Sequence, residues 1–595
     1  MGIADSPSSA ERGETRERQL RQAEELFASL PQARGVAKEM FAGRFVDDWV
    51  FPYPELNRTE RVEVEAAVAA LRQFCDQHLD PVRIDREADI PREVIDGLGE
   101  LGLLGMTAPA EFGGHGFSQM GYCRLLEVIG GRCSSTSIFV NAHHSIGMRG
   151  LLLFGTESQQ QKWLPDLVCG KKLAAFALTE PDAGSDASNV QTMAIPSADG
   201  SHFVLHGQKR YITNGAIADV LTVMARTPVE GSRETAITAF LVTPDMAGFR
   251  VTEPRMEKMG IRGTATARLA FDNLHVPREN ILGPIGKGLK VALTVLDFGR
   301  TTFGACCTGA AKTCLRLARD HAHTRQQFGR PLAEFELVQE KLVRMAAWTY
   351  AMEATTHVTA SLIDRGLEDY MLETAMLKVW STERLWTIVN DAFQIFGGAA
   401  YFTDQPLERM LRDHRINQIG EGANEVLLSF IALTGMRGPG MRMKEMSEAW
   451  KHPASGLAAV GHFTRDALRM RFTTPTVPVW SPELRGEARR LGKAIRRLGT
   501  TVQWTLVRHR EEVLERQLVL QRIAWVAMEL FATACTLSRW DHEIATNHHT
   551  HDEVARWFVA DSLRHVERGF RALRDNEDRL LLAAAKSSAV RPQAT

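Results

Sequence analysis

The chain has 595 residues and eight cysteines, with a formal net charge of −1 and a sequence pI near 7.0. This length exceeds what one hydrophobic core usually holds, so we expect several domains. The balanced charge offers no global basic field for nucleic acid, and the cysteines show neither zinc-type pairing nor the density of a disulfide scaffold.

The N-terminal region is polar, and no apolar run in the sequence approaches the ~20 residues that cross a bilayer. The first 35 residues lack the apolar stretch of a secretory signal, and their six acidic residues disfavour a mitochondrial transit peptide. These features predict a cytoplasmic location of the bacterial type. We expect residues 1–55 to form a tail followed by an aromatic-rich segment that packs along a domain surface.

Helical patterns dominate residues 56–175, which we assign to an N-terminal helical domain. The stretch 91–106 begins with Pro91, a residue that favours the start of a helix. Three glycines in this stretch form a G-x-G-x-x-G array. Because the array follows a helix start rather than a strand, we reject it as a dinucleotide fingerprint.

Between residues 176 and 286 the pattern changes to short β-rich runs broken by Gly, Pro and Asn, which predicts a small antiparallel sheet or barrel. After this domain the helical patterns return. Four long helices are predicted at 289–320, 335–364, 369–396 and 423–435.

These four helices predict a bundle domain over residues 287–437. Residues 438–482 form a proline-containing linker, and residues 483–595 form a further helical domain. The stretch 513–537 is apolar nearly all round and is therefore expected to be buried. The predicted fold class is mainly α with a β insert.

A carboxylate between two glycines, Gly420-Glu421-Gly422, follows a partly buried segment near the end of the bundle. The glycines permit a sharp turn and close approach of a ligand. An apolar cleft raises the pKa of a carboxyl group toward that of a useful general base. We place Asn424 at the N-cap of the next helix. An ordinary glutamate in a helix-breaking loop remains an alternative at this point.

Five motifs occur in a fixed order around this loop. They are FALTEPDAGSD (176–186), KRYITNG (209–215), RQQFG (325–329), QIFGG (394–398) and RDHRINQIGEGANEVL (412–427). In these motifs and their spacing the chain resembles the acyl-CoA dehydrogenases. From about residue 36 to 585, with the additional helical domain, it resembles the very-long-chain branch and a related protein that assists respiratory complex I assembly.

The resemblance implies an FAD-dependent enzyme of fatty-acid β-oxidation. Such an enzyme oxidises long-chain acyl-CoA to trans-2-enoyl-CoA and passes electrons to electron-transfer flavoprotein. It implies that Glu421 is the catalytic base, since the position where some relatives carry the base on an earlier helix is Gly299 here. An acyl-CoA oxidase that reduces oxygen and a scaffold protein with residual activity are the alternatives.

The resemblance also implies the cofactor contacts. Arg325 and Phe328 match an element that reaches the neighbouring subunit's FAD, which implies at least a homodimer. For Tyr211, a residue of the β-domain core is the alternative. The implied cofactor residues are Phe176, Leu178, Thr179, Gly184, Ser185, Tyr211, Ile212, Thr213, Arg325, Phe328, Gln394, Gly397, Gly398, Ala423, Asn424 and Glu425.

For acyl-CoA, the implied contacts are Ser185, Asp297, Arg300, Gly420 and Gly422. Asp297 and Arg300 are spaced i, i+3, so a local salt bridge is the alternative for this pair. Two positions depart from the family pattern. Ala423 stands where a Thr hydroxyl usually lies near the FAD phosphates, and Gly420 stands where an aromatic residue is common.

Two further features concern the substrate and the membrane. Shorter-chain relatives close the acyl pocket with longer polar side chains in the region that matches 138–142, which is apolar here apart from Asn141. The resemblance therefore implies a deeper acyl tunnel and a preference for chains of about C14 or longer. Basic and apolar residues alternate in 442–472, which suits a helix in the bilayer interface, with a linker packed on its own domain as the alternative. Four histidines at 542–551 are interpreted as a solvated loop, and no metal site is predicted.

Overall fold

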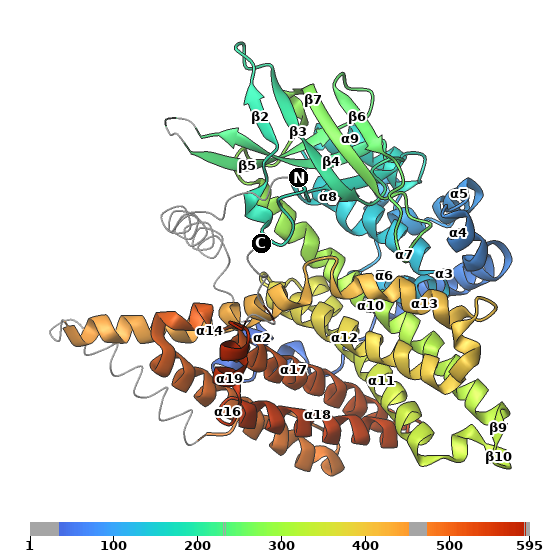
Figure 1. The fold of residues 1–595 in the computed structure, drawn as a ribbon, viewed down its shortest axis with the longest axis vertical. Coiled ribbons are helices and arrows are strands. Elements are labelled where there is room, and N and C mark those ends of the chain that lie inside the picture. The colour runs from blue at the N-terminus through green and yellow to red at the C-terminus, as the bar shows by residue number, and fades with distance from the viewer. Residues whose placement is uncertain (1–34, 230, 232–233, 452–472, 588–589, 591–595) are drawn as a thin grey trace.

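The computed structural model describes residues 35–590 except 230, 232–233, 452–472 and 588–589. In Figure 1 the β-sheet stands at one end of the molecule, above a body of long helices. The C-terminal helices pack along the opposite side of that body. Most of 442–472 lies outside the described residues.

The N-terminal helices start where side chains cap them, as for Asn57, Asp80, Ser118 and Thr156. Pro91 is the N-cap of a helix, which confirms the predicted start. The helices are α2 (Val36–Phe41), α3 (Arg58–His78), α4 (Pro81–Glu87), α5 (Arg92–Glu100), α6 (Gln119–Arg132), α7 (Ser134–Val140), the π-helix η4 (Asn141–Met148), α8 (Arg149–Phe154) and α9 (Glu157–Val168).

The β-domain contains the strands β1 (Ala174–Ala177), β2 (Met193–Pro196), β3 (His202–Ile212), β4 (Val220–Pro228), β5 (Thr235–Val242), β6 (Phe249–Glu253), β7 (Ala267–Pro277) and β8 (Ile281–Leu282). Their order is β6-β7-β3-β2-β4-β5-β8, and β1 pairs with β4. Most pairings are antiparallel as predicted, but β1 and β2 each run parallel to β4, so the sheet is mixed.

The bundle contains the four predicted helices, with somewhat different bounds, and one that the periodicity did not reveal. They are α10 (Gly288–Thr324), α11 (Glu336–Asp364), α12 (Met371–Phe396), α13 (Pro406–His414) and α14 (Asn424–Lys451). Between α10 and α11 lie a small hairpin, β9 (Gln326–Gln327) and β10 (Arg330–Pro331), and the turn η7 (Leu332–Glu334). The turns η8 (Gly397–Tyr401) and η9 (Arg415–Gln418) flank α13.

Helix α10 holds the domains together because glycines let its neighbours approach closely. A Cβ added to Gly309 would lie 1.9 Å from the carbonyl oxygen of Glu127 on α6, and one added to Gly304 would lie 2.8 Å from Leu377 on α12. The same helix therefore contacts the N-terminal helices on one side and the bundle on the other (Figure 1).

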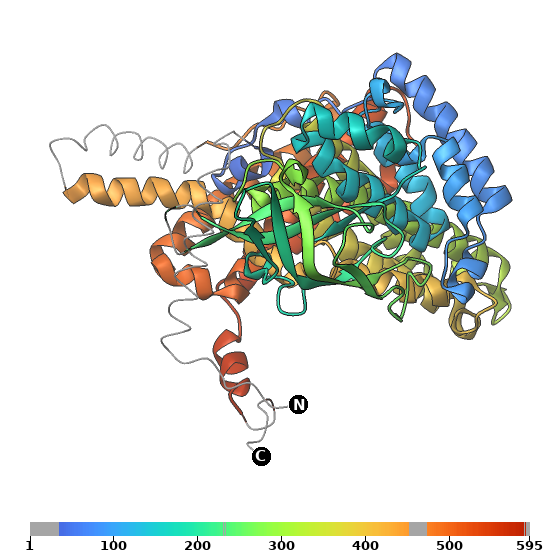
Figure 2. The same ribbon diagram turned by 90° about the horizontal axis from the view of Figure 1, so that it is seen from above.

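The C-terminal domain consists of α16 (Arg485–His509), α17 (Gln517–Ala545), α18 (Asp552–Ala572) and α19 (Asp578–Ala584). Its buried side chains form one continuous core with those of the bundle. The N-terminal segment does more than pack along a surface, because Phe41 is fully buried and lies 2.4 Å from where a Cβ on Gly435 would be. Seen from above in Figure 2, α14 projects beyond this packed body.

Among the described residues, one helix, α17, is long and apolar enough to cross a membrane. However, 72% of its most apolar stretch is buried inside the protein. This burial agrees with the prediction from the stretch 513–537.

Candidate active site

Glu421 lies in the tight turn between η9 and α14. Its backbone φ is +58°, and that of Gly422 is +97°. The left-handed region costs a residue with a side chain about 1 kcal/mol, whereas glycine adopts it freely. Gly420 is different, because a Cβ there would meet only the Ile416 carbonyl oxygen at 3.7 Å. The backbone at position 420 does not need a glycine, because a residue with a side chain would fit there. The glycine therefore leaves an open space next to Glu421.

The carboxylate of Glu421 points into the interior between α10 and the π-helix η4. A Cβ added to Gly299 would lie 3.1 Å from Glu421 Oε2 and 2.8 Å from Ile146. Glu421 Oε2 is buried and has no hydrogen-bond partner among the described residues. Burial raises the pKa of Glu421, and the cations of Arg300 and Lys378 oppose this rise. A buried carboxylate with an unused oxygen is suited to accept a proton.

Hydrogen bonds from two helices hold the backbone of this turn. Arg300 Nε on α10 donates to the carbonyl oxygen of Glu421 at 3.4 Å. Lys378 Nζ on α12 donates to the carbonyl oxygen of Gly422 at 2.7 Å and to Asn424 Oδ1 at 2.8 Å. Since these are the carbonyls of Glu421 and of the residue that follows it, the helices fix the direction in which the carboxylate points.

The prediction that Asn424 is an N-cap is wrong. Helix α14 begins at Asn424 itself, and the carbonyl of Ala423 accepts from the backbone N–H groups of Val426 and Leu427. The Asn424 amide instead donates to Thr382 Oγ1 at 3.0 Å and Glu383 Oε1 at 2.7 Å. Because the Asn424 side chain bonds these partners on α12 and Lys378, it does not cap the N-terminus of α14.

Asp297 and Arg300 form the local salt bridge that the i, i+3 spacing offered as an alternative. Arg300 Nη1 lies 3.0 Å from Asp297 Oδ1, and both side chains are buried. Thr374 Oγ1 also donates to Asp297, and burial raises the pKa of Asp297 to about 6. The pair turns toward the Glu421 loop, so a contact with the CoA arm stays a proposal.

The predicted flavin-ring residues gather at the ends of β1 and β3. Phe176 and Leu178 are buried, while Thr179 and Thr213 are half-buried. Lys209 Nζ donates to the Leu178 carbonyl at 3.0 Å and to Glu180 at 2.7 Å, which fixes the chain after β1.

Tyr211 is not a residue of the β-domain core. Its side chain is 55% exposed at a backbone φ of +61°, whereas the neighbouring Ile212 is buried. The adjacent loop presents Gly184 and Ser185 to solvent, and in the part of the chain that the structure describes no atom lies within 4 Å of where a Cβ on Gly184 would be. An aromatic ring and an open loop thus face outward on the same domain.

A second group of predicted residues lies at the other end of the molecule, around the β9–β10 hairpin (Figure 1). Phe328 at the hairpin tip is 93% exposed, and Arg325 is exposed at the end of α10. Gln394, Gly397 and Gly398 are exposed as well, and the two glycines have open space around them.

Stacking of His321 on Phe396, with ring centroids 4.1 Å apart, joins the end of α10 to the end of α12. The hairpin and the Gly397–Gly398 turn therefore belong to one surface. Tyr211 belongs to a different domain, at the end of β3.

Family models match most of the chain in domain order. Residues 61–171, 175–274 and 286–435 match the acyl-CoA dehydrogenase N-terminal, middle and C-terminal domains, and residues 482–590 match the ACAD9/ACADV C-terminal domain. The chain belongs to the acyl-CoA dehydrogenase family.

Individual relatives agree with this family. The chain is 34% identical to the very long-chain specific acyl-CoA dehydrogenase of Homo sapiens over 92% of this chain and 85% of that protein. It is 33% identical to the probable acyl-CoA dehydrogenase FadE10 of Mycobacterium tuberculosis, over 91% and 86% of the two chains.

Solved structures extend the likeness to the fold. An acyl-CoA dehydrogenase from Bacillus anthracis, complexed with FAD, has a TM-score of 0.76 at 29% identity, over 93% of this chain and 95% of that one. Butyryl-CoA dehydrogenase from Megasphaera elsdenii has a TM-score of 0.60 at 33% identity, over 64% and 98%.

Sequence reasoning missed two contributors to this acyl-CoA dehydrogenase site. Lys378 was not selected, although a lone cation within the apolar run AMLKVW is unusual for a buried helix. Ile146 was not selected either, because no sequence signal marks the π-helix that places it. The predicted residues Ala423 and Glu425 lie on the turn and the first turn of α14, half-buried and exposed respectively.

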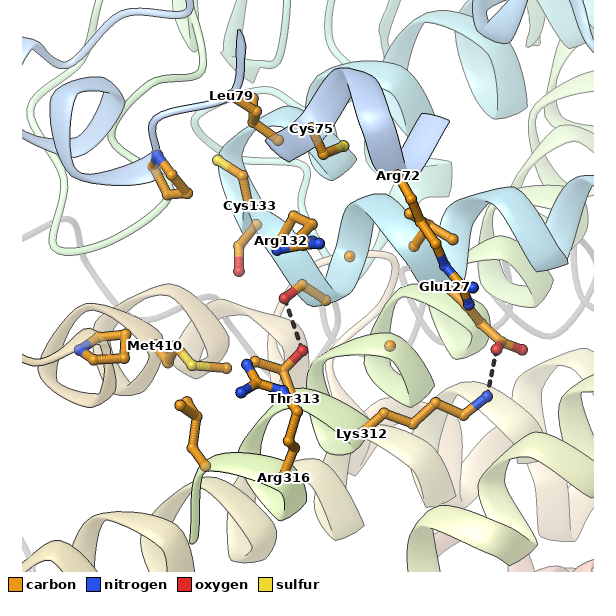
Figure 3. Close-up of a pocket in the computed structure, with 18 of the residues that line it drawn as sticks. Arg72, Cys75, Leu79, Glu127, Arg132, Cys133, Lys312, Thr313, Arg316 and Met410 are labelled. Atoms are coloured by element: carbon orange, nitrogen blue, oxygen red, sulfur yellow. Dashed lines mark hydrogen bonds and ion pairs between the residues drawn. The ribbon is translucent and has the colours of Figure 1, made fainter. Parts of the chain in front are cut away.

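A cavity of about 790 Å³ is lined by none of the predicted site residues (Figure 3). It lies between α3, α6, α10 and α13, where Lys312 pairs with Glu127 at 2.7 Å. Glu127, Glu353 and His357 are close enough to bind a metal. However, Lys312, Arg124 and Arg539 already neutralise these carboxylates, so the cluster is better described as an ion-pair network.

The predicted loop histidines also have local partners. His549 lies 2.9 Å from Asp552, and His551 lies 3.2 Å from Glu543. His548, His549 and His551 lie between α17 and α18, as the prediction of a loop requires, whereas His542 lies on α17, so the prediction is wrong for that residue.

We predict that Gly299→Ala will slow the oxidation of acyl-CoA while leaving the fold intact. The added methyl would displace the Glu421 carboxylate and Ile146, and a misplacement of ~1 Å can cost on the order of 100-fold in rate. Turnover with an artificial electron acceptor measures the effect. Gly438→Ala is the matched control, since no atom of the described residues lies within 4 Å of where its Cβ would be. Equal activities for the two variants would contradict the prediction.

Proposed function

We propose that this protein is an FAD-dependent acyl-CoA dehydrogenase that oxidises long-chain acyl-CoA to trans-2-enoyl-CoA in fatty-acid β-oxidation. The observation that carries the proposal is the buried, unpartnered Oε2 of Glu421, held in a turn that α10 and α12 clamp. The FAD of the Bacillus anthracis relative and the substrate of the human relative support it.

Glu421 acts as the base that removes the proton from Cα of the acyl chain. Its site excludes water, which raises its proton affinity. As the proton leaves, negative charge grows on the thioester oxygen, which then needs hydrogen-bond donors. Within the described chain, the backbone N–H of Glu421 donates no hydrogen bond, so it is available for this oxygen.

The residues present fit an FAD molecule. Tyr211 offers an exposed ring beside Thr179 and Thr213, and Gly397 and Gly398 leave open space where a phosphate could approach the backbone. When bound, FAD supplies the hydride acceptor that no side chain can provide. Arg325 would bind the pyrophosphate through its planar guanidinium.

We infer a homodimer with a shared cofactor site. The ring-side residues around Tyr211 and the surface around Arg325 are both exposed, but they lie in different domains, at the end of β3 and at the end of α10. A second copy can bring its hairpin to the ring side of the first. Electron-transfer flavoprotein is the proposed acceptor of the electrons.

The acyl chain is proposed to run along η4 and the end of α7. Phe139, Val140 and Ala142 are buried there, and the only polar side chain among them, Asn141, accepts from Thr302 Oγ1 at 2.6 Å. Because that amide oxygen is already bonded, it does not block an apolar chain. This arrangement supports a preference for long chains.

The location is proposed to be cytoplasmic with peripheral contact to the inner membrane face. The supporting feature is the basic and apolar sequence of 442–472. Residues up to Lys451 continue helix α14, which projects from the body of the protein (Figure 2).

We predict that Glu421→Gln will bind FAD and acyl-CoA but will not turn over, because the amide keeps the shape and removes the base. Anaerobic single-turnover mixing with palmitoyl-CoA measures the bleaching of the flavin. Retained FAD absorbance and a ligand-induced spectral shift serve as controls for an intact site. Near-normal flavin reduction by this variant would contradict the assignment of Glu421 as the base.

We predict that Arg325→Ala will lose FAD while retaining its fold. Loss of a charge-assisted contact across an interface can cost ~2–5 kcal/mol. FAD content after dialysis is the measurement. Arg330→Ala is the matched control on the same hairpin, since Arg330 stacks on Phe335 at 4.1 Å within its own chain. Equal FAD content in both variants would count against a shared site.

We predict that kcat/KM rises with chain length to about C14 or longer, since each buried CH₂ adds up to ~0.8 kcal/mol. A series of acyl-CoA substrates from hexanoyl to palmitoyl measures this profile. A maximum at hexanoyl- or octanoyl-CoA would refute the long tunnel.

We predict that the intact protein co-sediments with anionic liposomes at low salt and that deletion of 442–472 abolishes this binding. Neutral liposomes provide the control. If the intact protein stays in the supernatant, the proposed membrane contact is wrong.

A further inference from the structure

Lys378 lies beside the catalytic turn without a carboxylate in direct contact among the described residues. Its side chain is fully buried in α12. Its hydrogen bonds go to two uncharged acceptors, the Gly422 carbonyl and Asn424 Oδ1. A buried ammonium without a paired anion is costly, so its presence here calls for a compensating charge nearby.

Glu421 supplies that charge. Of the groups that face Lys378, the Glu421 carboxylate attracts the ammonium most strongly, and Arg300 on α10 repels it. Cys307 on α10 and Glu383 on α12 contribute less. Burial still dominates and lowers the pKa of Lys378 to about 7. The influence is mutual, since Lys378 and Arg300 are the cations that oppose the rise in the Glu421 pKa.

The hydrogen bonds around Lys378 also fix geometry. Lys378 and Thr382 are spaced i, i+4 and lie on one face of α12. Together they hold the Gly422 carbonyl and both ends of the Asn424 amide. Gly422 directly follows Glu421, and Asn424 begins the next helix. The bonds from α12 therefore fix the position of the chain where the strained turn ends.

We propose that Lys378 is a positioning residue for Glu421, which anchors the turn on α12 and supplies the positive charge that keeps this carboxylate ionised before it takes the proton. The inference rests on the proposed role of Glu421 as the base. It assigns Lys378 no contact with the substrate or the flavin.

The test is the pH dependence of flavin reduction by palmitoyl-CoA in single-turnover mixing. The base must be ionised, so the rate falls as the pH drops through the pKa of Glu421. Lys378→Met removes the cation, raises that pKa, and moves the acidic limb upward by about one pH unit, because a charge at such range shifts a pKa by ~1–3 units. We expect the rate at pH values below the limb to fall by up to about tenfold, which is the most that a shift of one pH unit produces, with FAD content and KM nearly unchanged.

Two variants separate charge from packing. Lys378→Arg keeps the charge, so its acidic limb stays near that of the unmodified protein even if its rate is lower. Lys312→Met is the matched control, because it removes a cation from another ion-pair cluster, roughly 20 Å along α10 from Gly299. Its profile should not move. An unshifted limb in Lys378→Met, or an equal shift in Lys312→Met, would overturn the inference.

The outcomes also distinguish this inference from the proposed function. Normal flavin reduction by Glu421→Gln defeats the proposed function, whereas an inactive Glu421→Gln with an unshifted Lys378→Met profile defeats only the role of Lys378. If Lys378→Met does not fold, it is combined with Glu421→Gln, which removes the unbalanced carboxylate. Recovery of folded, FAD-containing protein supports the coupling, and failure of the double variant overturns it.

Discussion

The position of one carboxylate constrains the rest of this structure. Glu421 has a left-handed backbone conformation that is unfavourable for a residue with a side chain, so the surrounding contacts must select it. Arg300 from α10 donates to the carbonyl oxygen of Glu421, and Lys378 from α12 donates to that of Gly422. Gly299 provides the space into which the carboxylate points. The site therefore depends on two neighbouring helices of the bundle that hold a single turn through consecutive carbonyls.

Helix α10 makes this arrangement possible and links it to distant parts of the chain. Its glycines contact α6 through Gly309, α12 through Gly304 and the carboxylate through Gly299. Its far end carries Arg325 and the hairpin. Helix α10 therefore determines how far the Glu421 carboxylate extends into the interior, how the N-terminal helices pack and where the proposed dimer contact lies. A shift of α10 along its axis would disturb all three together.

Much of this fold follows from the sequence, because long helices and short β-rich runs have different periodicities. The long helices of the bundle and the buried α17 were predictable in this way, and the motif around Glu421 identified the candidate base. The parallel pairing of β1 and β2 with β4 was not predictable, since alternation of residues does not reveal the neighbour of a strand.

The errors at the site have a common physical cause. Asn424 was assigned to an N-cap from its local sequence, but its amide bonds Thr382 and Glu383, which are more than forty positions away. Lys378 was overlooked because its partners are also remote in sequence. Tyr211 could equally have been a core residue, and only its 55% exposure decides the matter. Local patterns predict elements, whereas these polar side chains depend on contacts between elements.

The two exposed groups of proposed cofactor residues lie in different domains of the chain. Within one chain Tyr211 lies at the end of β3 and Arg325 at the end of α10, and both are exposed residues that we propose contact the cofactor. If each FAD needs one group from each chain, a monomer holds only half of either site. Binding of FAD and association of the two chains then stabilise each other, because a ligand that binds only the assembled form shifts the equilibrium toward it. The carboxylate is prepared within one chain, but in this arrangement the oxidation it serves requires two.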